Sequence, residues 1–539
     1  MSSAVCLAIN YADVAYFGFI EKRSSFDVFR LMGEQTDFSA LLPLFLKDYW
    51  YLFLFFLINV FILAILYGYF EKRLLLSVQS KEKNLSIIYR FVIFLFVAFF
   101  SVLGMRGGLQ LSPLSITHAA ESVDGPLIPL ALNSPFSIMK TYNLKGLQEL
   151  NLMSDQLAET NFNPIKNPKP TSSFLNKNVV VIILESFSYE YTAYGRKKSY
   201  TPFLDSLSQK GLLFYKGYAN GKRSIEGIPA ILASMPSFGE PYVNSIHCGN
   251  KIESFASLLK RKGYHSSFFH GGKNGTMSFD AFCKISGFDF YSGLNEYPNA
   301  DDYDGQWGIW DMPYLSQYVK ELSKFPQPFF SSVFTLSSHH PFLLPEALKN
   351  KFAEGDLPIH KTIRYTDEAL KNFFRDASHE PWFENTLFVI TADHTGPSED
   401  GYFSNSVGNY RIPILFYGKN VEFPKINNRL IQQVDLLPSV LHLLNYDLPY
   451  FSFGNNVFDS GAVPFVVNMH NNLHQIIQGD KLYQFNRDKI LSYYELDKDS
   501  LLQNQIKGLK PTDSLIIRRF HSFLQVYQNR IVRNKTAIR

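Results

Sequence analysis

The sequence of 539 residues is poor in cysteine and in charged side chains. It has three cysteines, Cys6, Cys248 and Cys283, which are too few for a framework of disulfides. Cys248 and Cys283 could pair in an oxidising compartment, but we expect two buried, unpaired thiols instead. Charged residues make up 19% of the chain, below the roughly 25% of ordinary soluble proteins.

The formal net charge of +4 is nearly balanced, so no nucleic-acid partner is expected. Aromatic residues reach 16% of the chain, and the apolar surplus is concentrated in the first hundred residues. Residues 49–70 contain no charge, and residues 87–105 contain only Arg90, near one end where its side chain can reach water. Both runs are long enough to cross a bilayer. Two buried core helices are the alternative.

Basic residues in the loop between these two runs predict the orientation. Lys72, Arg73, Lys81 and Lys83 lie in this loop, and a short loop rich in lysine and arginine is normally cytoplasmic. The sequence therefore predicts a multi-pass protein of the cell (inner) membrane, with the chain after Met105 outside the cytoplasm.

Residues 1–20 are half apolar but carry Asp13, so they do not have the pattern of a transmembrane helix. A chain that starts outside normally needs an earlier crossing, so we expect the membrane region, residues 1–106, to be incomplete at its N-terminus. No secretory signal peptide is visible. Residues 107–173 are expected to form an extracytoplasmic helical linker, with an amphipathic helix over 137–153 and an extended, proline-rich stretch over 161–170.

Short apolar runs alternate with helical stretches from residue 178 onward. Strands are predicted at residues 179–184, 267–269, 329–335, 386–391 and 412–417. The β-branched run over 179–184 is typical of a strand buried in a parallel sheet. The pattern predicts an α/β fold with a mainly parallel sheet.

Polar residues stand where two of these strands end. Glu185 follows the first strand, and Asp393 and His394 follow the strand at 386–391. Ligands of such sheets bind beyond the carboxyl ends of the strands, so one site could gather all three. Two carboxylates, an imidazole and a hydroxyl suit Mn²⁺, Mg²⁺ or Zn²⁺. Each residue also has an ordinary alternative, as a neighbour of a helix start or as part of a loop.

Ser224 precedes a helical stretch over residues 228–234. Backbone N–H groups at a helix N-terminus stabilise a phosphate, and a serine beside a metal ion is a competent nucleophile for phosphorus. Alternatively, Ser224 only caps the helix, and Lys222 and Arg223 are solvated charges.

Read in order, the motifs resemble those of the lipoteichoic acid synthase family of membrane phosphoglycerol transferases, within the alkaline-phosphatase/sulfatase-like superfamily. The matching stretches are residues 184–186, 200–207, 211–214, 218–224, 227, 338–342, 391–394 and 434–438. The resemblance implies an alkaline-phosphatase-like catalytic domain over 174–460, preceded by transmembrane helices. Residues 461–539 are expected to add hairpins and a basic amphipathic helix over 515–531.

The resemblance also implies one catalytic metal ion, usually Mn²⁺, bound by Glu185, Ser224, Asp393 and His394. Ser224 takes the position of the family's nucleophile, which is commonly threonine. His339 matches a histidine that contacts the substrate phosphate.

One segment departs from the family pattern. The family has a tryptophan and an arginine after a His-Gly pair, where they hold glycerol phosphate. Met277 and Phe279 fall roughly at those positions here, and Lys273 and Asn274 are possible replacements. The headgroup of the donor lipid therefore stays open.

The sequence predicts a metal-dependent phosphotransferase that moves a phosphoglycerol-type group from a membrane phospholipid, through a phosphoserine, to a glycan, glycolipid or polymer acceptor. Alternatives are a sulfatase-like phosphodiesterase or sulfuric ester hydrolase, a phosphoethanolamine transferase and a non-catalytic envelope protein. Formylglycine sulfatases have proline and arginine where Glu226 and Ile228 stand. Phosphoethanolamine transferases typically have several disulfides in the soluble domain.

Overall fold

A computed structural model describes residues 2–20, 23–24, 26, 43, 46–79, 87–106, 132–142, 147–195, 198–245, 247, 250–486, 489–506, 508 and 513–538. The chain separates into two compact units. One consists of Met1–Val28 and Ser39–Leu144, and the other of Phe29–Phe38 and Lys145–Arg539.

The first unit contains the long apolar helices. Its described helices are α1 (Ser2–Ile20), α4 (Trp50–Gln79), α5 (Ile87–Arg106) and α8 (Ser134–Thr141). Within α4 and α5, Trp50–Arg73 and Ile87–Gly104 have a mean hydropathy of 2.4, and none of their residues is buried inside the protein. Apolar side chains that face outward all round a helix are typical of contact with lipid. Both predicted spans are thus helices long and apolar enough to cross a membrane.

Helix α1 differs from these two helices because it carries a buried carboxylate. Asp13 accepts hydrogen bonds from Arg23 Nη1 at 2.9 Å, from the Ser24 amide at 2.8 Å and from Ser134 Oγ at 2.7 Å. These bonds satisfy the charge and join α1 to the chain that follows it and to α8. The apolar part of α1, Ser3–Phe17, is shorter than a membrane span, as its sequence predicts.

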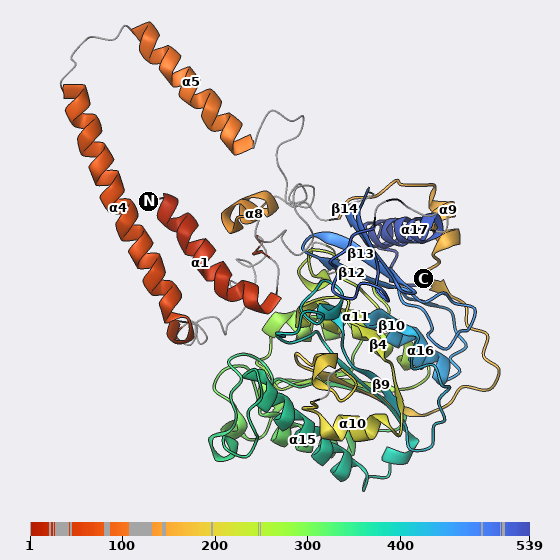
Figure 1. The fold of residues 1–539 in the computed structure, drawn as a ribbon. Helices are drawn as coiled ribbons and strands as arrows, with labels where there is room; N and C mark the ends of the chain where they lie inside the picture. Colours follow the sequence, from red (N-terminus) through yellow and green to blue (C-terminus); the bar gives the residue numbers. More distant parts are fainter. Residues whose placement is uncertain are drawn as a thin grey trace. The chain divides into compact units, whose positions relative to one another are not determined.

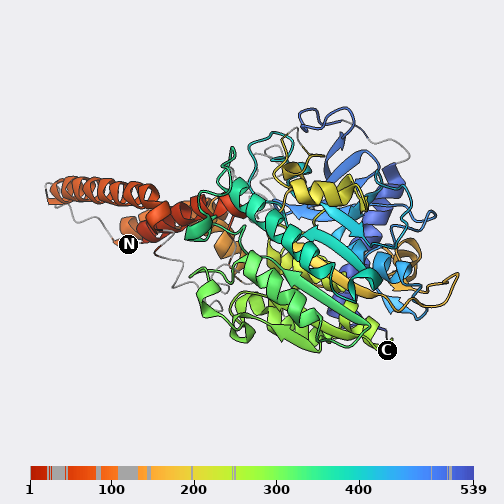
Figure 2. The same ribbon diagram turned by 90° about the horizontal axis from the view of Figure 1, so that it is seen from below.

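The second unit is built on a seven-stranded sheet (Figures 1 and 2). The strand order is β3 (Leu212–Leu213), β9 (Ile414–Tyr417), β8 (Thr386–Ala392), β2 (Asn178–Leu184), β7 (Phe329–Phe334), β5 (His265–His270) and β6 (Phe290–Ser292). The five strands from β8 to β6 are parallel, and β9 runs antiparallel to both of its neighbours. All five predicted strands are confirmed. The prediction missed β3 and β6, which have two and three residues and so carry no periodic pattern.

Helices cover both faces of this sheet. They are α10 (Pro202–Ser208), α11 (Ser224–Ala233), α12 (Phe255–Lys260), α13 (Phe279–Ser286), α14 (Asp311–Leu322), α15 (Ile359–Ala377) and α16 (Leu436–Leu443). Phe374 of α15 packs on Phe388 of β8 with ring centroids 5.0 Å apart, and Phe255 of α12 packs on Phe330 of β7 at 4.9 Å. Every residue of β2 is buried, as a central strand with helices on both sides requires.

Three smaller sheets complete the unit. Strands β12 (Val466–His470), β13 (Leu473–Gln478), β14 (Lys481–Asn486) and β15 (Lys489–Glu495) form an antiparallel meander, followed by α17 (Asp513–Val532). This confirms the predicted hairpins and helix. The other two sheets pair β1 (Ile165–Lys166) with β11 (Tyr450–Phe451), and β4 (Lys216–Tyr218) with β10 (Leu430–Gln432).

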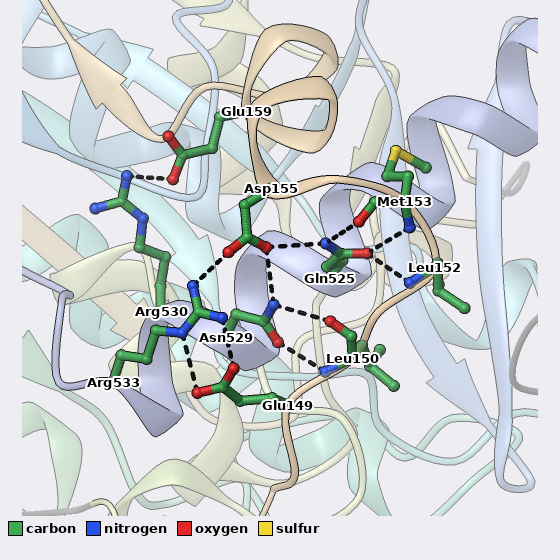
Figure 3. Close-up of polar contacts among 10 residues, drawn as sticks. All are labelled: Glu149, Leu150, Leu152, Met153, Asp155, Glu159, Gln525, Asn529, Arg530 and Arg533. Carbon is green, nitrogen blue, oxygen red and sulfur yellow. Dashed lines mark hydrogen bonds and ion pairs between the residues drawn. The ribbon is translucent and has the colours of Figure 1, made fainter.

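Residues 149–159 are bound along one side of α17 (Figure 3). Gln525 accepts from the amides of Leu152 and Met153 at 2.7 and 3.0 Å, and donates to the carbonyl of Met153 at 2.8 Å. Asn529 accepts from the Leu150 amide at 2.7 Å and donates to its carbonyl at 2.9 Å. Ion pairs surround these bonds: Arg533 with Glu149 and Asp155, and Arg530 with Glu159.

The predicted helix over residues 137–153 is therefore correct only up to residue 141, where α8 ends, and wrong for the described residues 147–153. The chain forms α8, then α9 (Asp155–Asn161), and the described residues 147–153 between them are not helical. Their backbone groups bond to side chains of α17 instead of to one another, because Gln525 and Asn529 offer both donors and acceptors. Helices α9 and α17 lie side by side (Figure 1).

The cysteines stay partly untested. Cys283 is a buried free thiol, in agreement with the expectation, and Cys248 lies outside the described residues.

A buried carboxylate on α15 caps the start of α10. Asp367 accepts from the amides of Phe203 and Leu204 at 2.8 and 2.9 Å, two donors that the helix itself cannot satisfy. Burial raises the pKa of Asp367 to about 7, whereas an aspartate in an unfolded chain has a pKa of about 4.

The raised pKa of Asp367 makes the stability of the protein depend on pH. Between pH of roughly 4 and 7 the folded state binds the Asp367 proton more tightly than the unfolded state, so the free energy of unfolding falls as the pH rises through this interval. We expect Asp367→Asn to lower the free energy of unfolding overall. Its decrease between pH 5 and pH 8 should be about 1–3 kcal/mol smaller in the variant than in the wild type. Denaturant unfolding of both proteins at pH 5 and pH 8 measures the difference. Equal pH slopes for the two proteins would contradict the assignment.

Candidate active site

The candidate site lies at the carboxyl ends of three adjacent strands, β8, β2 and β7. Glu185 follows β2 directly, and Asp393 and His394 follow β8. His339 stands five residues beyond the end of β7. Because neighbouring parallel strands end at the same edge of a sheet, the topology brings these residues together from positions far apart in the chain.

Glu185, Asp393 and His394 form one compact cluster. Their ligand atoms lie within 4.8 Å of one another. His394 Nε2 is 3.3 Å from Asp393 Oδ2 and 3.7 Å from Glu185 Oε1. Among the described parts of the chain, this is the one cluster of three or more histidine, cysteine or acidic side chains with a spacing that suits a metal ion.

The hydrogen bonds of His394 show which of its nitrogens faces the cluster. Nδ1 lies 2.9 Å from the carbonyl of Thr395, and since a carbonyl only accepts, Nδ1 carries the hydrogen. In the neutral ring Nε2 then presents a lone pair to Asp393 Oδ2. Two lone pairs at this distance repel unless a proton or a metal ion lies between them. Histidine ligands of metals commonly have this arrangement, with the second nitrogen bonded to a backbone carbonyl.

The two carboxylates are buried side by side. Glu185 is 1% exposed and Asp393 0%. Burial, and then the charge of Asp393, raises the pKa of Glu185 well above its usual range. Asp393 Oδ2 is buried without a hydrogen-bond partner among the described residues. Two buried acids with an unsatisfied oxygen are costly without a cation, so these residues fit a divalent metal ion.

One oxygen of each carboxylate is bonded to Ser186, in the turn after β2. Asp393 Oδ1 accepts from the amides of Ser186 and His394 at 2.9 and 2.7 Å, and Ser186 Oγ donates to Glu185 Oε1 at 2.6 Å. Ser186 has a φ of 57°, in the left-handed region that non-glycine residues seldom adopt. Strain of this kind is commonly found at functional sites. Here it turns the Ser186 amide toward Asp393.

Ser224 is the first residue of α11. Its Oγ donates to Glu185 Oε2 at 3.3 Å, and the side chain is 3% exposed. Arg223 occupies the N-cap position, without a side-chain capping bond. The hydroxyl is therefore directed at the carboxylate, and the capping alternative is not what the structure shows. A Cβ on Gly227 would lie 2.4 Å from the carbonyl oxygen of Asp393, so only glycine lets α11 approach β8 this closely.

The basic residues before Ser224 are not solvated charges, as the capping alternative requires. Lys222 is 9% exposed, and its Nζ donates to Thr395 Oγ1 at 2.8 Å, to the Asn409 carbonyl at 3.1 Å and to Asn409 Oδ1. Arg223 Nη2 pairs with Glu226 Oε1 at 2.7 Å. Lys222 thus adds a buried positive charge beside the residue that follows His394.

His339 lies beside this cluster. Burial, with a smaller contribution from the neighbouring His394, lowers its pKa to about 3. The indole of Trp307 lies over the imidazole, with ring centroids 3.5 Å apart. The sequence prediction missed Trp307. A signal was present, because two of the four tryptophans stand at 307 and 310, outside the apolar runs.

In the segment that departs from the family pattern, Lys273, Asn274 and Phe279 contact other residues of the second unit. Asn274 donates to both carboxylate oxygens of Glu296 at 3.1 Å. Lys273 Nζ lies 6.0 Å above the ring of Tyr303, and Phe279 is fully buried in the core. Phe279 therefore does not face a ligand.

The chain is similar to several known proteins. The sulfatase family model matches residues 177–446. The lipoteichoic acid synthase-like protein YvgJ of Bacillus subtilis is 27% identical over 318 residues, which are 54% of this chain and 51% of that protein. The lipoteichoic acid synthase of Staphylococcus aureus is 28% identical over 354 residues, 60% of this chain and 53% of that protein. The chain thus spans about half the length of the curated relatives it matches.

Solved structures share the fold of the second unit. A protein of the alkaline phosphatase superfamily from Vibrio parahaemolyticus has a TM-score of 0.63 and 27% identity, covering 71% of this chain and 98% of its own. The lipoteichoic acid synthase LtaP from Listeria monocytogenes has a TM-score of 0.58 and 18% identity, covering 70% of this chain and 98% of its own. The predicted alkaline-phosphatase-like fold is confirmed.

Proposed function

Because this chain belongs to the sulfatase family, we propose that it is a metal-dependent phosphotransferase that moves a phosphoglycerol-type group from a membrane phospholipid to a hydroxyl of the cell envelope. The observation that carries the proposal is the Ser224 hydroxyl at the start of α11, 3.3 Å from a buried carboxylate of the candidate metal cluster.

Glu185, Asp393 and His394 would hold the metal ion, and the Ser224 hydroxyl would be the fourth ligand. Manganese is the metal we favour, with Mg²⁺ or Zn²⁺ as alternatives, because two carboxylates, a hydroxyl and one imidazole make an oxygen-rich ligand set. A bound divalent ion lowers the pKa of a hydroxyl and offsets charge on phosphoryl oxygens.

In the first step, Ser224 Oγ attacks the phosphorus of a lipid such as phosphatidylglycerol. The bond from Oγ to phosphorus forms, and the bond from phosphorus to the diacylglycerol oxygen breaks. The Ser224 proton passes to Glu185 Oε2, which already accepts its hydrogen bond, and the diacylglycerol oxygen takes a proton from water. Backbone N–H groups at the start of α11 would stabilise the phosphoryl oxygens.

In the second step, a hydroxyl of a glycan, glycolipid or polymer attacks the phosphoserine. The new oxygen–phosphorus bond forms, the bond to Ser224 Oγ breaks, and Oγ recovers its proton from Glu185. The attacking hydroxyl loses its proton, and His339 is the candidate acceptor of this proton, because it is a neutral imidazole beside the cluster.

The two apolar helices fit a lipid donor. We propose that α4 and α5 anchor the protein in the cell membrane with the second unit outside the cytoplasm, since the basic loop between them favours the cytoplasmic side. A lipid donor then diffuses in the plane of the anchor. If water takes the place of the acceptor, the same site is a phosphodiesterase, which is the second candidate function.

The test uses the full chain in detergent with Mn²⁺ and a panel of fluorescent phospholipids, with products identified by mass spectrometry. We expect diacylglycerol to be released from phosphatidylglycerol, and a covalent adduct of glycerol phosphate on Ser224 before an acceptor is added. Release of diacylglycerol without an adduct on Ser224 would contradict the phosphoserine route. Turnover of sulfate esters alone would favour the hydrolase.

A further inference from the structure

Trp307 and His339 meet at one backbone carbonyl. The indole Nε1–H donates to the carbonyl of His340 at 2.5 Å. His339 Nδ1 lies 3.2 Å from the same oxygen, and since a carbonyl only accepts, Nδ1 carries the ring hydrogen. The indole plane is inclined by 36° over the imidazole. Trp307 therefore covers one face of His339 and shares its hydrogen-bond acceptor.

This arrangement fixes which nitrogen of His339 is free. A neutral imidazole with its hydrogen on Nδ1 presents a lone pair at Nε2. Such a nitrogen accepts a hydrogen bond from a hydroxyl, whereas an unprotonated phosphoryl oxygen offers it no hydrogen. A flip to the other tautomer would place the Nδ1 lone pair against the carbonyl oxygen of His340, which is unfavourable.

A tight turn holds Trp307 in place. Asp304 Oδ1 accepts from the amides of Gln306, Trp307 and Gly308 at 2.7, 2.8 and 3.1 Å. A Cβ on Gly308 would lie 2.5 Å from Leu336 Cδ1 and 2.7 Å from the carbonyl oxygen of Gly271, so glycine is needed where the turn packs against these residues.

The other end of the same segment forms hydrogen bonds with residues 336 and 337, which precede His339. Asp311, at the start of α14, is 2% exposed and accepts from the amides of Leu336 and Ser337 at 2.8 and 3.2 Å. Its other oxygen accepts from Thr366 Oγ1 at 2.5 Å. Residues 304–311 thus contact both ends of the stretch 336–340 that carries His339.

We propose that Trp307 is a positioning residue, which holds His339 with its hydrogen on Nδ1 so that Nε2 accepts the hydrogen bond of the hydroxyl that attacks the phosphoserine. As that hydroxyl forms its bond to phosphorus, its proton passes to Nε2 and from there to solvent. The inference rests on the proposed function. It implies that the substrate bound next to His339 Nε2 is an alcohol.

The test compares Trp307→Ala and Trp307→Phe in the full chain in detergent, with Trp310→Ala as matched control. Trp310 stands three residues further along the same segment, and its ring centroid lies 6.3 Å from that of Tyr365. Its replacement therefore tests the loss of packing alone. The phenyl ring of Trp307→Phe covers His339 but lacks the N–H. Nitrogen-15 NMR of histidine-labelled protein reports the tautomer of His339 without any substrate, and His339→Ala assigns the signal.

We expect Trp307→Ala to raise the population with hydrogen on Nε2 and to slow the second step by about 10-fold or more. The burst of diacylglycerol from the first step and the thermal shift produced by Mn²⁺ should stay unchanged. Trp307→Phe should slow the second step less, by about 2–5-fold. Trp310→Ala should leave the His339 signal as it is.

An unchanged tautomer in both Trp307 variants would overturn the inference, and so would an equal loss of rate in Trp307→Ala and Trp310→Ala. If Trp307→Ala fails to fold, Trp307→Phe carries the test. If the wild-type protein releases no diacylglycerol, the proposed function fails, while the NMR signal still decides whether Trp307 holds the His339 tautomer.

Discussion

Replacing Ser224 with alanine is expected to lower lipid turnover by about 10³-fold or more, because the nucleophile is lost while the carboxylates stay in place. The hydroxyl is nearly fully buried and bonds to Glu185, so the variant also leaves one carboxylate oxygen with a hydrogen bond fewer. Release of diacylglycerol from a fluorescent phospholipid, followed as single turnover, measures the loss.

Ser224→Thr is the matched control. It keeps the hydroxyl and adds one methyl group at a buried position, so we expect at least roughly a tenth of the wild-type rate. The alanine variant should still show a thermal shift with Mn²⁺, since three of the proposed ligands remain. Unchanged turnover in Ser224→Ala would remove Ser224 from the chemistry, whatever the threonine variant does.

Exchanging Glu185 for glutamine is expected to act on stability in two opposite ways. In the metal-free protein two buried carboxylates lie side by side, and burial with the charge of Asp393 raises the pKa of Glu185. Removing one charge relieves this cost, so we expect the metal-free variant to be more stable than the wild type by roughly 1–3 kcal/mol at neutral pH. The wild type should gain about 2.7 kcal/mol from Mn²⁺ at a hundredfold excess over Kd, and the variant much less.

Thermal unfolding with Mn²⁺ and with a chelator separates the two effects. Glu253→Gln is a suitable control, because Glu253 is a buried glutamate that pairs with Arg261, outside the candidate cluster. We expect this control to be less stable than the wild type and to keep the full Mn²⁺ shift. A Glu185→Gln protein that loses stability without metal and keeps its Mn²⁺ shift would rule out the proposed ligand role.

The sequence allowed the sheet and the cluster to be predicted for the same reason. Buried parallel strands are continuous apolar runs, and the polar residues that end them, such as Glu185 and Asp393, stand out against them. Parallel pairing then brings the strand ends together without any knowledge of loops. Roles carried over from the resemblance, such as those of Ser224 and His339, stay predictions.

Features that depend on distant side chains could not be predicted in this way. The pattern over residues 137–153 favours a helix, but Gln525 and Asn529 take up the backbone groups of 150–153. Trp307 reaches His339 only because Asp304 closes a turn around three amides. Neither contact leaves a periodic signal in the sequence, since each is made by single side chains across long separations.

The binding of residues 150–153 to α17 sets an order of events during synthesis. Leu152 and Gln525 are 373 positions apart, so at 5–20 residues per second a ribosome needs roughly 20 to 75 s to go from one to the other. During this time the amides and carbonyls of the earlier segment are bonded to water. This stretch, although it is made long before α17, is therefore among the last parts of the second unit to be fixed.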